Sequence, residues 1–153
     1  MSYFLTAGVV KHALRLVRPV FDGLVEAEMT DGRTSLHVVV LKPGTDEILW
    51  EESWGDDKST WTRPYDEIAM AKAKLAQRTG MTIRTLRQDA PWLYEQGDIR
   101  FVGGVIENGL VVAASGLPDH WDEAISRMVL SALQGACRHS VSKIDQNSPP
   151  FFQ

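Results

Sequence analysis

The sequence predicts an α+β domain built on one antiparallel sheet. Turn dipeptides between runs of β-branched residues indicate two hairpins, and amphipathic helices precede, separate and follow them. Hairpins join antiparallel strands, whereas parallel strands would need long crossover connections. The 153 residues match the length of one domain, with a core that needs no metal or disulfide.

A helix is expected at the start of the chain. Thr6 can cap it, and an apolar stripe at helical spacing follows, made of Val9, Val10, Ala13, Leu14 and Val17. Pro19 is expected to kink or end this helix, because proline lacks the backbone N–H that a helix interior uses. Residues 20–29 would then form a second helical piece, which Asp31-Gly32 ends.

The first hairpin follows. The run LHVVVL, residues 36–41, is rich in β-branched residues and suits a buried strand. Lys42-Pro43-Gly44 fits a type II turn, with proline at the second position and glycine at the third. Residues 47–54 are therefore expected to form the return strand.

A middle helix is predicted over residues 64–79. Pro64 suits its first turn, and Gly80 is a good left-handed terminator. The helical spacing of Lys72 from Ile68 and Leu75 places it on the side of this helix that faces the core. A shorter helical segment starts at Thr82, and residues 91–97 form a turn or a short helix.

The second hairpin spans residues 99–115. Asn108-Gly109 is the dipeptide of a type I′ turn, so residues 99–106 and 110–115 are expected to pair. Asp119 can cap a last helix that ends near Arg138. The sequence thus predicts one domain over residues 1–139, with residues 140–153 as a C-terminal tail.

Composition excludes several classes of protein. There are 16 basic and 20 acidic residues, a net charge of −4, which argues against a nucleic-acid-binding surface. No apolar run reaches the length of a transmembrane helix, and the single Cys137 cannot form an internal disulfide. CxxC and HExxH are absent, so no metal site is expected. The N-terminus lacks the features of a signal peptide, which indicates a cytoplasmic protein without a membrane partner.

Three features could carry chemistry. Lys72 would either cover apolar surface with its stem or hold an anionic ligand. Gly103-Gly104, expected inside a strand, indicates either a β-bulge or the close approach of a ligand or second backbone. His120 lies at the start of the last helix, where anions collect, but it is also a typical exposed first-turn residue.

Five tryptophans are many for this length. Trp54 and Trp61 flank the polar loop GDDKSTWT, where an amphipathic ring often lines an interface or a pocket. Oligomerisation is the first explanation for this aromatic excess, and a ligand pocket is the second. Phe151 and Phe152 follow Pro149-Pro150 in the tail, which is either loose or docks these two rings on a neighbouring surface; docking would avoid the costly exposure of two aromatic side chains.

Four short pieces, in order, resemble the GlcG/HbpS-like family, also called the haem-degrading-domain family. The segment FVGGVIENGLVVAASGLPDHWDEAIS, residues 101–126, is similar to the family's double-glycine strand, D/N-G turn, small-residue strand ending in Ser-Gly, and helix opening with Asp-Glu. YDEIAMAKAKLA is similar to its helix with a lysine after an Ile-Ala pair, which Lys72 matches. LHVVVLKPGTDEILW takes the place of its first hairpin, and Pro91-Trp92-Leu93-Tyr94 that of its turn before the glycine strand.

The resemblance covers residues 36–138 and has departures. No proline follows the double glycine, residues 19–35 are altered, and the tail is unmatched. The matched core offers no evident His, Cys or Tyr axial ligand, so haem binding does not transfer directly. The family includes an accessory protein of glycolate-utilisation operons, a haem-binding partner of a redox sensor, and a domain of some corrinoid adenosyltransferases.

The resemblance implies a GlcG/HbpS-like sandwich that forms homo-oligomers. It implies a small-ligand-binding accessory protein of a bacterial catabolic operon, with haem or another tetrapyrrole such as a corrinoid as the first ligand and a small organic acid as the second. The predicted ligand-binding residues are Lys72, Gly103, Gly104 and His120, with Trp54 or Trp61 at the pocket edge.

Two alternatives stay open. One is an enzyme acting on a small carboxylate or a muconate-like catabolite, in which Lys72 is a clamp or base and His120 an acid. The other is a structural oligomer without a ligand, which would place Trp54, Trp61 and the phenylalanine tail at subunit contacts.

Overall fold

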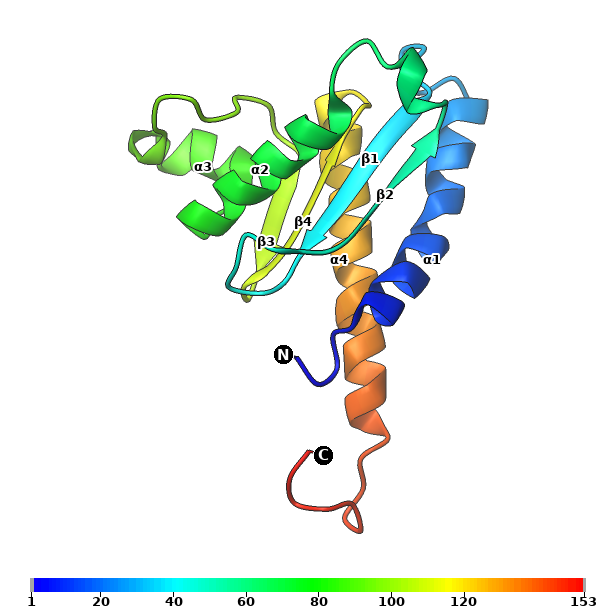
Figure 1. The fold of residues 1–153 in the computed structure, drawn as a ribbon, viewed down its shortest axis with the longest axis vertical. Helices are drawn as coiled ribbons and strands as arrows, with labels where there is room; N and C mark the ends of the chain where they lie inside the picture. The colour runs from blue at the N-terminus through cyan, green and yellow to red at the C-terminus, as the bar shows by residue number, and fades with distance from the viewer. Residues whose placement is uncertain (1, 153) are drawn as a thin grey trace.

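A computed structural model describes residues 2–152, in which helices surround a four-stranded sheet (Figure 1). The helices are α1 (Ala7–Glu26), α2 (Tyr65–Thr79), α3 (Ile83–Asp89) and α4 (Asp119–Ser142). The strands are β1 (Ser35–Leu41), β2 (Ile48–Gly55), β3 (Gly104–Glu107) and β4 (Leu110–Ser115). Two short 3-10 helices, Lys58–Thr60 and Pro91–Leu93, complete the described elements.

The sheet has the order β2-β1-β4-β3, and every pair is antiparallel. This confirms the predicted α+β class and both hairpins. Asn108 and Gly109 have φ values of 49° and 81°, as a type I′ turn requires, and Gly44 has a φ of 76°, as a type II turn requires. Strand β1 is central because it pairs with both β2 and β4.

Helices cover both faces of the sheet. Helices α1 and α4 pack together on one face, while α2 crosses the other face over β1 and β4 (Figure 1). Leu36, Val38 and Val40 of β1 point into the larger core under α1 and α4, whereas Val39 and Leu41 point into the core under α2. Burial on both faces explains why the β1 sequence is an unbroken apolar run rather than an alternating one.

Helix α1 continues through Pro19, so the prediction that proline divides this segment is wrong. Pro19 lies on the exposed side of the helix. Beyond it, Phe21 and Leu24 extend the buried stripe that begins at Val10. Their packing under the sheet holds the helix together despite the missing N–H.

Two other boundaries differ from the prediction. Strand β3 begins at Gly104 rather than residue 99, because Gly103 has a φ of 132° and Ile99 and Val102 pack beside α3 instead. Helix α4 runs to Ser142, so it enters the predicted tail, and it follows Pro118 with no side-chain cap. The expectation that Asp119 caps this helix is therefore wrong.

The last turns of α4 extend beyond the sheet, at the end of the molecule where both chain termini lie (Figure 1). There Phe152 stacks on Tyr3 with ring centroids 4.9 Å apart, and it also contacts Phe4 edge-on. Phe151 remains 80% exposed. The expected docking of the tail is thus found for Phe152 alone, against the chain's own N-terminal segment.

Candidate functional site

A small hollow of about 130 Å³ lies where α2 and α4 begin, beside the C-terminal end of β4. Three connecting segments meet at this hollow: the loop before β1, the segment before α2 and the turn from β4 into α4. The polar side chains that line the hollow are those of Arg33, Arg63, Tyr65, Lys72, Ser115, Asp119 and Asp122.

A buried ion pair forms the floor of the hollow. Lys72 of α2 and Asp122 of α4 have side chains that are 1% and 2% exposed, and Lys72 Nζ lies 3.0 Å from Asp122 Oδ2. Lys72 Nζ also donates to the carbonyl oxygen of Ala114 at 2.9 Å. The backbone N–H of Leu117 donates to Asp122 Oδ1 at 2.9 Å. An ammonium has three protons, and within residues 2–152 two of them have an acceptor, which leaves one without a protein partner.

Burial has the largest effect on the pKa of the Asp122 carboxyl. Removal from water raises its pKa to about 6, against the opposing effects of Lys72 and of the Leu117 N–H. Asp122 is therefore mostly ionised at pH 7, and the ion pair with Lys72 exists at neutral pH. It is lost by protonation in mildly acidic solution.

Gly103 is required by the close approach of the ion pair. A Cβ at this position would lie 2.8 Å from Lys72 Nζ and 2.9 Å from the Ala114 carbonyl oxygen, and the φ of 132° disfavours any side chain. Ser126 Oγ holds the Gly103 carbonyl at 2.8 Å. A Cβ at Gly104 would lie 2.8 Å from the Lys72 carbonyl oxygen. Of the two predicted explanations, a β-bulge and a close approach, the second holds: the backbone at Gly103 and Gly104 lies close to α2 and to the side chain of Lys72.

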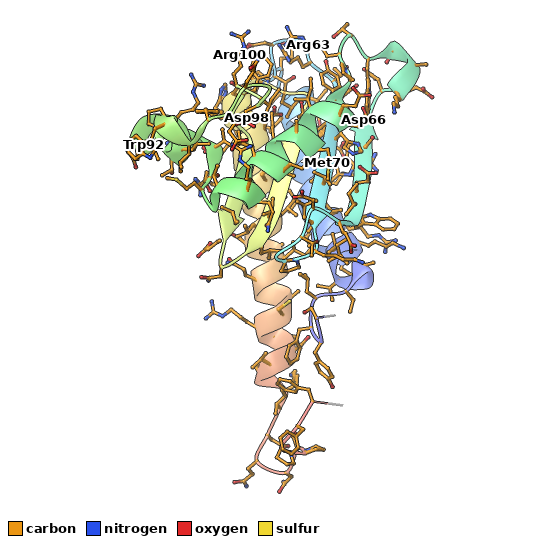
Figure 2. The ribbon with its side chains drawn as sticks, turned by 60° about the vertical axis from the view of Figure 1, so that its left-hand side comes forward. Arg63, Asp66, Met70, Trp92, Asp98 and Arg100 are labelled. Carbon is orange, nitrogen blue, oxygen red and sulfur yellow. The ribbon has the colours of Figure 1, made fainter. Side chains whose placement is uncertain are left out.

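The rim of the hollow is basic. Arg33 and Arg63 line it. Arg63 and Arg100, both labelled in Figure 2, have guanidinium carbons 5.7 and 5.1 Å from the centroid of the Phe101 ring. Among the described residues none of these three arginines has an acidic partner within salt-bridge distance.

Two helices point their positive ends toward the same place. Helices α2 and α4 each follow a proline, Pro64 and Pro118, and neither has a side-chain cap. Their first-turn N–H groups and partial positive charges favour a bound anion. The carboxylates of Asp66 and Asp119, in the same first turns, offset this positive charge in part.

The structure brings together some of the predicted residues and separates others. Lys72 lines the hollow, with Gly103 and Gly104 against it. His120 is exposed, packs beside Trp121 at a centroid distance of 5.4 Å, and does not line the hollow. The expectation that His120 points into this site is corrected, because its side chain turns to solvent in the first turn of α4.

Trp54 also leaves the predicted site. It is 1% exposed and packs against Phe21 in the core under α1, on the opposite side of the sheet from α2. Its position at a pocket edge is therefore corrected, since alternate residues of β2 face opposite sides. Trp61 lines a second, neighbouring hollow.

Sequence reasoning did not find Asp122, Arg33 or Arg63. A signal for Asp122 existed, because it precedes Ile125 and Val129 at helical spacing on the apolar face of α4. A carboxylate on a buried apolar stripe needs a partner of opposite charge, and Lys72 is the lysine that faces inward. For the two arginines, which lie in loops, no periodicity was available.

Within residues 2–152, no group of three or more His, Cys, Asp or Glu side chains is placed to hold a metal ion. No helix in that range has both the length and the apolar character needed to cross a membrane.

Neither a family model nor a curated protein matches the sequence. Solved structures do match. Klebsiella pneumoniae protein ORFY, described as DUF336, has 14% identity and a TM-score of 0.60, over 85% of this chain and 90% of that one. A double mutant of Streptomyces reticuli HbpS has 22% identity and a TM-score of 0.59, over 87% and 89%. A PduOC:haem complex has 15% identity and a TM-score of 0.51, over 86% and 94%. The chain therefore has the GlcG/HbpS-like fold, as predicted.

Proposed function

We propose that this protein binds a small organic anion whose carboxylate enters the hollow between α2 and α4. The observation that carries the proposal is the gathering of positive groups there: Lys72 at the floor, arginines without acidic partners at the rim, and two uncapped helix N-termini. Carboxylates are bound by such groups through charge-assisted hydrogen bonds. A volume of about 130 Å³ suits a few heavy atoms and lies below the range of roughly 300–1,000 Å³ typical of drug-sized ligands.

Binding to a simple carboxylate tests the proposal. Titration with propionate, followed by NMR, should show saturable shifts centred on residues of the hollow, with a millimolar Kd because so few atoms make contact. Arg33→Gln and Arg63→Gln should each weaken binding roughly tenfold, the size of one charge-assisted hydrogen bond. Both side chains are exposed, so the fold should survive.

Arg15→Gln is the matched control, because Arg15 is an exposed arginine on α1, which packs on the other face of the sheet. It should leave the propionate Kd unchanged. Equal weakening by all three variants would indicate a general charge effect and would reject the hollow as the site.

A tetrapyrrole is the second candidate ligand, favoured by the likeness to the fold of a PduOC:haem complex. A whole tetrapyrrole does not fit inside the hollow, which is too small, and the described residues that line it include no His, Cys or Met. Such a ligand would have to bind elsewhere on the surface or between subunits, with at most a carboxylate in the hollow.

A haemin titration by visible absorbance, run beside light scattering for mass, tests this second candidate. A saturable Soret shift at a fixed ratio per subunit, at the mass of a defined oligomer, would support it. A rise that never saturates would reject it and leave the small anion as the ligand.

A further inference from the structure

The two edge strands of the sheet differ in how they are covered. At β3, the backbone N–H of Ile106 donates to Thr82 Oγ1 at 3.2 Å, so the residue that leads into α3 occupies this edge. At β2, which forms the other edge, no strand within residues 2–152 pairs with the outer side (Figure 1). An open strand edge is a place where a strand of another chain can add to the sheet.

The register of β1 and β2 determines which backbone groups of β2 point outward. The N–H of Asp56 donates to the carbonyl of Thr34 at 3.3 Å, so these two residues form a hydrogen-bonded pair. Opposed residues of an antiparallel ladder alternate between bonded and non-bonded pairs. Counting along the register from this pair, Glu51, Ser53 and Gly55 occupy non-bonded positions. Their N–H and C=O groups therefore point away from β1, to the open edge.

This edge is accessible. Glu51, Ser53 and Gly55 are all exposed, and the exposure of Gly55 is that of its backbone because glycine has no side chain. Among the described residues, no backbone group outside the β1 ladder bonds to these three. Residues 50–55 contain no proline, which is one of the ways in which natural edges are protected. The irregularity in the register is confined to the other end of the strand pair, between Val40 and Leu41.

The charge around the edge determines what kind of strand can add. Residues 46–57 contain six acidic side chains and no basic one: Asp46, Glu47, Glu51, Glu52, Asp56 and Asp57. Lys58, the next basic residue along the chain, is engaged by Asp66. A second copy that paired through the same edge would bring these carboxylates together, and like charges opposite each other destabilise a sheet. The partner strand must therefore carry positive charge.

The two faces of β2 suit different side chains. Glu51 lies on the α2 side, opposite Val39, and its side chain is 43% exposed. Trp50 lies half-buried on the α1 side, with Lys11 Nζ already 4.1 Å from its ring centroid. A basic side chain therefore fits beside Glu51, and an apolar one fits beside Trp50. Because successive residues of a strand alternate between faces, the partner must alternate basic and apolar residues.

We propose that the open edge of β2 binds an extended segment of another protein, in which lysine or arginine alternates with apolar residues, as an added antiparallel strand. Antiparallel pairing is the more stable arrangement per residue. In this arrangement the basic residues lie opposite Glu51 and Ser53, and their own N–H groups donate to β2. The surface is separate from the proposed anion site, so each proposal stands or fails without the other.

A labelled peptide of sequence Ac-Lys-Val-Lys-Val-Lys-Val-NH2 tests the proposal by fluorescence polarisation. It should bind saturably, and the peptide with glutamate in place of lysine should bind at least about tenfold more weakly. N-methylation of the lysines keeps their charge and removes the N–H groups that face β2, so it should also weaken binding at least about tenfold. N-methylation of the valines, whose N–H groups face away, should change the Kd by less than about threefold.

Ser53→Pro tests the same contact from the side of the protein. It removes an outward N–H, while the bonds to β1 belong to the residues on either side, so the variant should bind the peptide at least about tenfold more weakly. Ser53→Ala is the matched control, because it removes the hydroxyl and keeps the N–H, and it should retain the wild-type Kd. Circular dichroism checks that both variants fold. If Ser53→Pro does not fold, the two N-methylated peptides decide on the wild-type protein.

Three results would overturn the proposal. One is the absence of saturable binding of the lysine peptide. Another is equal weakening by the two N-methylated peptides, or wild-type affinity in a folded Ser53→Pro variant, since either would show attraction by charge without strand addition. The third is a dimer in light scattering that becomes a monomer in Ser53→Pro, which would assign the edge to a second copy of this chain.

Discussion

The pair Lys72–Asp122 shows what burial does to two opposite charges. Each has a partner at 3.0 Å, and each accepts or donates a further hydrogen bond to the backbone. Removing one partner from such a pair leaves the other charge buried and costs about 3–5 kcal/mol, whereas replacing both costs little. The pair is therefore a weak source of net stability but a strong constraint on how α2 and α4 meet.

We expect Lys72→Met to lower the free energy of unfolding by roughly 3–5 kcal/mol at pH 7.5, measured by urea unfolding. The cost should be smaller at pH 5, because the Asp122 carboxyl left behind can then be protonated. Lys74→Met, at an exposed position of the same helix, should change stability by less than about 0.5 kcal/mol.

The sign of the wild-type pH dependence follows from the same shift. The folded-state pKa of Asp122, about 6, is above its ordinary value of 3.8. Protonation of Asp122 therefore stabilises the folded state fully below pH 3.8, and this stabilisation disappears as the pH rises through 6. Lys72→Met/Asp122→Asn should remove this titration and recover most of the stability lost at pH 7.5. A Lys72→Met cost that is the same at both pH values would contradict burial as the cause.

At the level of elements, the helices and turns that local chemistry determines were the predictable part. Gly80 ends α2 in the left-handed conformation, and Asn108-Gly109 forms the predicted turn. Boundaries that depend on tertiary packing were not predictable. Pro19 lies inside α1 because Phe21 and Leu24 bury beyond it, and nothing in the local sequence reports that burial.

Pro19→Ala is expected to stabilise the protein. The substitution restores a helical N–H and removes a ring that clashes with the preceding turn, on an exposed face where alanine costs no packing. The free energy of unfolding should rise by about 1–3 kcal/mol, with a higher Tm in thermal unfolding followed by circular dichroism. Leu16→Ala, a substitution on the same exposed side, serves as the control and should have little effect. A Pro19→Ala variant that is less stable than the wild type would contradict this account.

At the scale of the whole molecule, the site is assembled from parts that are distant in the chain. Lys72 and Asp122 are 50 residues apart, and Arg33 reaches the hollow from the loop before β1. The inward direction of Lys72 could be predicted from helical spacing alone. Its partner could not, because the contact depends on how α2 and α4 cross the ends of β4. The same reason explains the errors at Trp54 and His120, since chain proximity to a loop does not determine which side of the sheet a ring faces.

The central position of β1 has a consequence for the making of the protein. Its neighbours on the two sides are synthesised at different times: β2 follows at once, whereas β4 and the covering helix α4 follow only after α2, α3 and β3. Until then the apolar underside of the first hairpin and the inner stripe of α1 lack the cover that α4 provides. The nascent chain thus exposes apolar surface until α4 emerges, and a pause in translation before that point would leave this surface open to aggregation or to chaperones.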